Sequence, residues 1–129
     1  MTPTGTRVRF PRRGEVDLEE FAVPAPSAGE ALIQTEFSLI SPGTERAVLL
    51  ALPNTTGQFP TRPGYSNVGV VAAVGPGVVG LAIGDRVASE AHHTSHALVS
   101  EQRAFRLPEG LAGEEAVFFN LAAIALQGV

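Results

Sequence analysis

The chain has 129 residues, of which 44% are hydrophobic and 17% charged, and its formal net charge at pH 7 is -4. This composition predicts one globular domain with a core, and a chain of 129 residues is too short for two domains of ordinary size. The negative net charge argues against binding to nucleic acid or to an anionic membrane surface. The absence of cysteine excludes disulfides, thiolate nucleophiles and thiolate zinc sites.

Targeting and membrane segments are not predicted. Residues 1–10 lack the apolar stretch of a signal peptide. No run of the sequence approaches the roughly 18 apolar residues that a membrane span requires. We therefore expect a soluble, cytoplasmic protein.

Short strands and turns are expected in the first part of the chain. Residues 6–10 and 15–21 have β-compatible alternation on either side of a Pro-Arg-Arg-Gly turn, which predicts an opening hairpin. Residues 30–39 alternate polar and apolar side chains and predict a half-buried strand. One face of this strand is expected to carry Ile33, Phe37 and Leu39.

The middle of the chain predicts one short helix followed by a series of strands. Residues 44–50 are expected to form the helix, which ends before Pro53. Further strands are expected over residues 67–74, 86–89, 95–99 and 104–107. With 14 Gly and 10 Pro supplying frequent turns, the pattern predicts a mainly β, barrel-like sheet.

The character of the sequence changes at Gly113. Glu114 and Glu115 fall in the first turn of a predicted helix, where negative charge is favoured. Residues 116–129 are apolar on nearly all sides, and such a helix is expected to be buried. It therefore either packs under this domain or belongs against another one.

Residues 75–80 read GPGVVG and match the dinucleotide-binding pattern GxGxxG after an apolar strand. Glu101 lies about 20 residues further on, where that pattern has an acidic residue. The motif binds pyrophosphate only if a helix begins at its second glycine. The following residues, LAIGDRV, are too short and too broken by glycine for that helix. We therefore interpret residues 75–80 as a turn between two strands.

Three segments form an ordered set of motifs. Residues 63–71 read PGYSNVGVV, residues 74–87 read VGPGVVGLAIGDRV, and residues 107–116 read LPEGLAGEEA. In order and spacing they resemble the PGHExxGxV, VGxGVxxxxxGDRV and LPxGLxxExA motifs of the GroES-like domain of medium-chain dehydrogenases/reductases. Residues 40–45, ISPGTE, look most like the branch of bacteriochlorophyllide dehydrogenase-like proteins.

The resemblance implies a mainly β fold, a GroES-like partly open β-barrel with short helices and a C-terminal linking helix. Residues 1–112 would form the catalytic-side domain. Residues 113–129 would begin the helix that links it to a Rossmann domain absent from this chain. In the family, NAD or NADP binds mainly to that second domain, and the small-molecule substrate lies in the cleft between the two.

The resemblance also implies that the catalytic zinc site is lost. The three ligand positions of zinc-dependent members are occupied by Pro42, Tyr65 and Asn120. A catalytic zinc needs about three ligands from cysteine, histidine or carboxylate side chains, and at best Glu45 remains. The family's four-cysteine structural zinc lobe is missing as well. We therefore expect no zinc.

His92, His93 and His96 form an HHxxH pattern that can suggest a metal site. Adjacent side chains on a strand point to opposite faces, and no carboxylate completes the set. We interpret them as loop and strand-start histidines, with metal binding as the alternative.

The candidate catalytic residues are Thr44, Tyr65 and Ser66. By position Thr44 matches the family's relay hydroxyl, while Tyr65 and Ser66 lie where the metal would be. The alternative for Thr44 is the N-cap of the short helix. For Tyr65 it is packing against the cleft, and Glu45 with Arg46 would simply form a solvated pair.

The function implied is that of the substrate-side domain of an NAD(P)-dependent, zinc-independent oxidoreductase. Hydride would pass to or from a small carbonyl, alcohol or enone, and this chain alone is expected to be inactive. The alternative is a self-contained binding or oligomerisation module without enzymatic activity, for instance a homodimer. The enzyme hypothesis predicts that residues 118–126 are partly uncovered, because a Rossmann domain would pack there.

Overall fold

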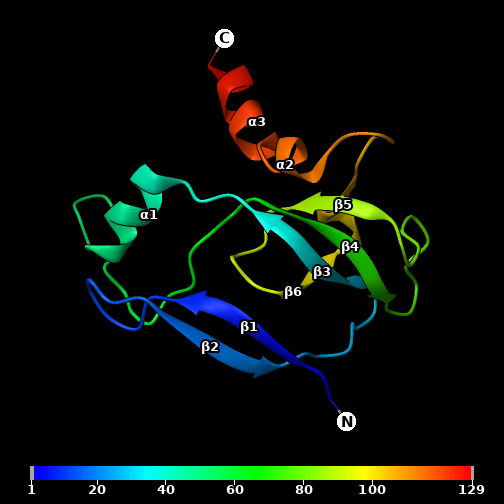
Figure 1. Cartoon of the computed structure of the whole chain (residues 1–129), viewed down its shortest axis with the longest axis horizontal. Coiled ribbons are helices and arrows are strands. Elements are labelled where there is room, and N and C mark those ends of the chain that lie inside the picture. Colours follow the sequence, from blue (N-terminus) through cyan, green and yellow to red (C-terminus); the bar gives the residue numbers. More distant parts are fainter. Residues whose placement is uncertain (1, 129) are drawn as a thin grey trace.

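The computed structural model describes residues 2–128 and contains two antiparallel sheets (Figure 1). Strands β1 (Thr4–Arg9) and β2 (Asp17–Ala22) form the predicted opening hairpin. The larger sheet has the strand order β6-β3-β4-β5-β7. Its strands are β3 (Glu30–Ser38), β4 (Asn67–Val74), β5 (Arg86–Ser89), β6 (His96–Ser100) and β7 (Phe105–Arg106). The predicted mainly β, partly open barrel is confirmed.

The helices lie at two ends of this framework. Helix α1 (Pro42–Leu49) begins two residues before the predicted start, because proline is well suited to the first helical position. A 3-10 turn, η1 (Glu101–Arg103), follows β6. Within residues 2–128, no helix is long and apolar enough to cross a membrane.

The C-terminal segment is bent. It forms α2 (Gly113–Ala116) and α3 (Phe119–Gln127) rather than one continuous helix, and α3 points away from the sheets (Figure 1). The start of the predicted helix is therefore right and its continuity is wrong. Its predicted last residue, Val129, lies outside the described residues, as does Met1 of the predicted domain.

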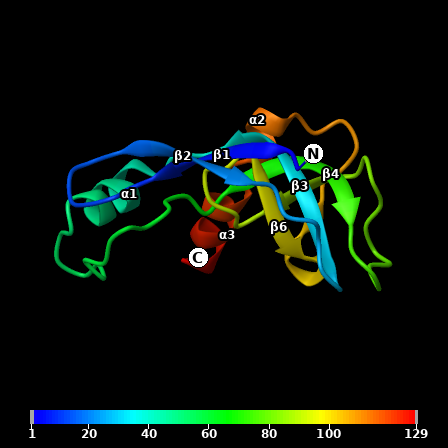
Figure 2. The same cartoon turned by 90° about the horizontal axis from the view of Figure 1, so that it is seen from below.

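The β1–β2 hairpin is attached at its middle and at its turn. Val8 N donates to His93 O at 2.9 Å, and Ser95 N donates to Thr6 O at 2.8 Å. At the turn, Gly14 N donates to Leu49 O at the end of α1. Figure 2 shows the hairpin reaching from the larger sheet to α1 in this way. The hairpin therefore joins the first helix to the segment that carries the histidines.

Apolar side chains fill both faces of the larger sheet. Neighbouring residues of a strand point to opposite faces, so Val87 and Ala88 belong to different clusters. The first cluster comprises Ala31, Ile33, Val71, Leu81, Val87, Val99 and Ala104. The second lies beneath α2 and comprises Val68, Ala88, Ala116 and Val117.

A β-bulge in β3 separates residues that were predicted to share a face. The pairing with β4 shifts between Thr35 and Phe37, so one extra residue is inserted there. Ile33 stays in the first cluster, whereas Leu39 packs against the second. Phe37 also lies on the second side, where its ring approaches Gly113. The predicted common face is therefore wrong, because an inserted residue reverses the alternation.

Gly75 lies where two loops come into close contact. Its N–H donates to Glu30 O at 2.8 Å, and a Cβ at this position would overlap the backbone carbonyl of Ser27. Only glycine fits so near a neighbouring backbone. The first glycine of the GPGVVG segment thus serves chain packing.

Gly75→Ala is expected to destabilise the domain by about 2 kcal/mol, because backbone rather than a flexible side chain must move. Gly43→Ala, in α1 with open space around the new methyl group, is the matched control and should be neutral or stabilising by up to ~1 kcal/mol. Urea denaturation of both variants measures the difference. Equal midpoints would contradict the close approach.

Candidate functional site

Tyr65 links the three segments that contain Pro42, Tyr65 and Asn120, the residues predicted to stand at the family's zinc-ligand positions. The Tyr65 hydroxyl donates to Ser41 Oγ at 2.8 Å. Ser41 is the residue directly before Pro42, where α1 begins. The side-chain amide of Asn120 donates to the Tyr65 carbonyl at 2.9 Å. Segments more than fifty residues apart are thereby brought to one place.

The side chains at this place do not fit a zinc ion. Proline offers no ligand, and tyrosine and asparagine are not the donors of a catalytic zinc site. In the described part of the chain, no three histidine, cysteine, aspartate or glutamate side chains gather closely enough to hold a metal ion. The nearby carboxylate, Glu45, is engaged elsewhere.

Glu45 belongs to a buried polar line that sequence reasoning missed. Its Oε1 lies 2.7 Å from His93 Nε2, and His93 Nδ1 lies 2.7 Å from Ser38 Oγ. Its Oε2 accepts from Ser41 N at 2.6 Å. Both Glu45 and His93 are buried, so the expected solvated pair of Glu45 with Arg46 is wrong.

The line fixes the first turn of α1. The N-cap residue is Ser41 rather than Thr44, and its side chain makes no capping hydrogen bond. The carboxylate of Glu45 instead binds the Ser41 N–H, and negative charge is favourable near a helix N-terminus. The N-cap interpretation of Thr44 is therefore wrong, because the helix begins before that residue.

Thr44 is exposed and lies on the other side of α1 from Glu45. It lines a groove of about 520 Å³ together with Ala47, Val48, Pro53 and Thr61. A second cavity, of about 530 Å³, lies on the opposite side of the helix and is mainly apolar, with Glu45 and His93 in its wall. Both volumes are within the range of small-molecule sites.

Ser66 has a structural contact. It is 2% exposed, and its hydroxyl donates to the Val117 carbonyl at 2.5 Å, at the bend between α2 and α3. Ser66 therefore does not accompany Tyr65 and Thr44 at a surface. It ties the start of β4 to the C-terminal segment.

The three histidines have separate partners. His92 Nδ1 lies 2.9 Å from the Gly64 carbonyl, and His96 Nδ1 lies 3.0 Å from Ser95 Oγ. His93 is buried with Glu45. As predicted, they are loop and strand-start residues, and their side chains do not converge.

The GPGVVG segment is a turn, as predicted. The next element after it is strand β5 rather than a helix, and the backbone N–H groups of Val79 and Gly80 both donate to the carboxylate of Glu101. A pyrophosphate would need such amides free. These residues therefore do not form a dinucleotide site.

Helix α3 presents apolar side chains to solvent. Phe118 is 51% exposed, Ile124 52% and Leu126 74%, and none of the α3 residues is buried. The helix was predicted to be buried, but no part of the described chain covers it. The predicted partial uncovering of residues 118–126 is observed.

The sequence matches the family model of the alcohol dehydrogenase GroES-like domain over residues 27–123. The chain belongs to this family. This agrees with the resemblance of residues 63–71, 74–87 and 107–116 to its motifs. No curated protein matches the chain.

Solved structures share the fold. An alcohol dehydrogenase from E. coli CFT073, solved with NADH, is 21% identical with a TM-score of 0.84, and the alignment covers 95% of this chain and 44% of that one. E. coli quinone oxidoreductase with NADPH is 22% identical with a TM-score of 0.73, and the alignment covers 87% and 36%.

A third similar structure is an alcohol dehydrogenase superfamily protein from Novosphingobium aromaticivorans. It is 24% identical with a TM-score of 0.77, and the alignment covers 88% of this chain and 37% of that one. The chain therefore spans less than half the length of each of these three proteins.

Glu45→Ala is expected to lower the free energy of unfolding by about 2 kcal/mol, because it leaves His93 Nε2 buried without its partner. Glu90→Ala removes the partner of Arg103 in an exposed ion pair and is the control, with an expected effect below ~0.5 kcal/mol. Thermal and urea unfolding compare the two. A similar loss in both variants would refute the importance of the buried line.

Proposed function

We propose that this chain is the substrate-side domain of an NAD(P)-dependent oxidoreductase that works without zinc. The reaction is hydride transfer to or from a small carbonyl, alcohol or enone. The observation that carries the proposal is the position of Tyr65, at a replaced zinc-ligand position with its hydroxyl bonded to Ser41. A proton donor there replaces the metal as the group that polarises the substrate oxygen.

Tyr65 and Thr44 have different roles in this proposal. In the free chain the one proton of the Tyr65 hydroxyl points to Ser41 Oγ, 2.8 Å away. When substrate binds, this O–H turns to the substrate oxygen and exchanges its proton there, and the Ser41 hydroxyl donates to the Tyr65 oxygen in its place. Thr44 lies at the groove beside α1 and supplies a relay hydroxyl toward water. The nicotinamide, when bound, donates or accepts the hydride. Ser66 contributes by fixing the end of the loop that contains Tyr65 and leads into β4.

The cofactor is proposed to bind mainly to a Rossmann domain outside this chain. The exposed apolar residues of α3 support this, because a face of this kind is usually covered by another protein surface. The NADH- and NADPH-bound proteins that share the fold are also more than twice as long as the aligned region. Residues 113–129 would then link the two domains.

The non-enzymatic binding or oligomerisation module is the less favoured candidate. It requires a symmetric partner to cover α3, and nothing in the chain selects such a partner over a cofactor domain.

The bacteriochlorophyllide dehydrogenase-like branch is the proposed position within the family, on the basis of residues 40–45. Within that stretch, residues 42–45 (Pro42, Gly43, Thr44 and Glu45) take the place of the segment that supplies a zinc ligand in zinc-dependent members.

In the protein that contains both domains, Tyr65→Phe is expected to lower kcat by about 100-fold, because the proton donor is lost. Thr44→Val should lower kcat less and alter its pH profile. Thr55→Val, elsewhere in the same groove, is the control. NAD(P)H absorbance with a panel of small aldehydes, ketones and enones measures the rates. Full activity of Tyr65→Phe would refute the assigned role.

The purified 129-residue chain is expected to contain no stoichiometric zinc and to bind neither NADH nor NADPH at micromolar protein concentration. Elemental analysis and fluorescence titration measure these quantities. One zinc per chain would overturn the interpretation of Pro42, Tyr65 and Asn120. Tight binding of either nucleotide would overturn the assignment of the cofactor to another domain.

A further inference from the structure

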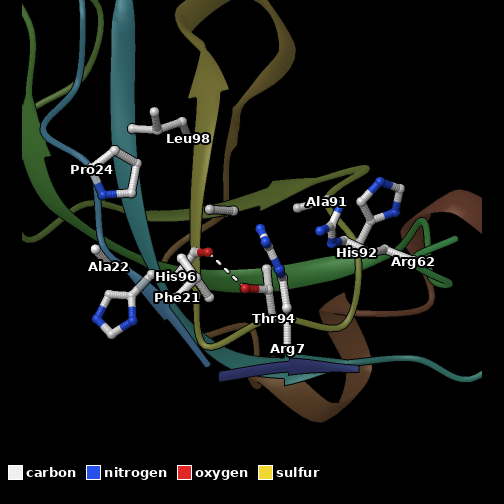
Figure 3. Close-up of a pocket in the computed structure, with 11 residues that line it drawn as sticks. Arg7, Phe21, Ala22, Pro24, Arg62, Ala91, His92, Thr94, His96 and Leu98 are labelled. Atoms are coloured by element: carbon white, nitrogen blue, oxygen red, sulfur yellow. Dashed lines mark hydrogen bonds between the residues drawn. The ribbon is translucent and has the colours of Figure 1, made fainter. Parts of the chain in front are cut away.

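A pocket of about 510 Å³ lies between the β1–β2 hairpin and the segment that leads into β6 (Figure 3). Its wall comprises Arg7, Phe21, Ala22, Pro24, Arg62, Ala91, His92, Thr94, His96, Ala97 and Leu98. None of the residues assigned above to the oxidoreductase site belongs to this wall. The volume suits a small molecule of ordinary size.

The charged part of the wall is cationic. Arg7 and Arg62 both line the pocket, and both bind the same carboxylate, that of Glu19. Arg7 Nε lies 2.8 Å from Glu19 Oε2, and Arg62 Nε lies 3.0 Å from the same oxygen. No aspartate or glutamate belongs to the wall.

One carboxylate for two guanidinium groups leaves a positive charge at the pocket. Hydrogen bonds from Arg62 and Arg7 lower the pKa of Glu19 to about 2, so it stays ionised at neutral pH. Arginine remains protonated in proteins. The three side chains together therefore carry one net positive charge beside the cavity.

The guanidinium group of Arg62 binds both oxygens of Glu19, through Nε and Nη2, whereas that of Arg7 is held in place with donors to spare. Arg7 lies over the ring of Phe21, with its Cζ 4.5 Å from the ring centroid. It gives only its Nε–H to Glu19 among the hydrogen bonds of residues 2–128, which leaves its terminal N–H groups for another acceptor. Such fixed, planar donors match the oxygens of a carboxylate or phosphate.

Apart from Thr94 and two histidines, the rest of the wall is apolar. Figure 3 shows Arg62 and His92 toward one side of the pocket and Pro24, Leu98 and His96 toward the other. Arg7 lies between the two sides, over the ring of Phe21. A ligand that fills this space presents an anionic group to the first side and an apolar body to the second. A free inorganic anion would leave the apolar side unfilled.

We propose that this pocket binds a small organic anion, with a carboxylate or phosphate group at Arg7 and Arg62 and an apolar body against Phe21, Pro24 and Leu98. This is a second binding function of the chain. It does not depend on hydride transfer and does not require the cofactor.

The test uses isothermal titration of the 129-residue chain with phenyl phosphate, benzoate, inorganic phosphate and benzyl alcohol. The organic anions should bind saturably at one site and more weakly as salt rises. Inorganic phosphate and the neutral alcohol should bind at least tenfold more weakly. Amide chemical-shift changes should centre on Arg7, Phe21 and Leu98.

Two substitutions have opposite expected effects. Arg62→Gln removes the residual charge and should weaken binding at least tenfold, whereas Glu19→Gln raises the charge and should strengthen it. Arg103→Gln breaks a comparable exposed ion pair outside the pocket and should change nothing. Circular dichroism checks that each variant is folded.

Several results would overturn the proposal. These are no saturable binding of either organic anion, equal binding of benzyl alcohol, or an equal loss in Arg62→Gln and Arg103→Gln. Stronger binding of benzoate than phenyl phosphate, or the reverse, identifies which head group the site prefers. Because none of these measurements involves hydride transfer, failure here leaves the oxidoreductase proposal standing.

Discussion

The buried contact between Glu45 and His93 joins the parts of this domain that surround the proposed site. Glu45 belongs to α1 and His93 to the segment before β6, and Ser38 at the end of β3 completes the line. The same carboxylate binds the amide at the start of α1. Since Tyr65 bonds to Ser41 beside that amide, its position also depends on this contact. A buried carboxylate and imidazole are tolerable because each has a hydrogen-bonding partner.

Much of the fold could be predicted from local sequence signals. Alternation and turn residues located the hairpin and the strands, and ordered motifs indicated the family. The bulge before Phe37 could not be predicted, because an inserted residue shows itself only in the pairing with β4. The bend after α2 was missed for a similar reason. Its residues are uniformly apolar, and a contact with Ser66 decides where it falls.

The site was predictable in part. Pro42, Tyr65 and Asn120 could be singled out because each lies in or near a motif, and in the structure Tyr65 is hydrogen-bonded to Asn120 and to Ser41, the residue before Pro42. Glu45 and His93 escaped notice because their partnership spans 48 residues and has no characteristic spacing. The Arg7, Glu19 and Arg62 cluster is equally long-range. Its charge balance emerges only when the hairpin is placed beside the loop before β4.

Residues 65 and 66 also hold the beginning of α3 in a fixed direction. The Tyr65 carbonyl accepts from Asn120, and the Ser66 hydroxyl donates to Val117, so neighbouring residues secure both sides of the bend. Beyond Asn120 the helix is exposed. The bend is therefore held in place on both sides, and α3 extends from it as a rigid element. A small shift in either hydrogen bond would displace the far end of α3 more than its beginning, so these two contacts set the direction of the helix.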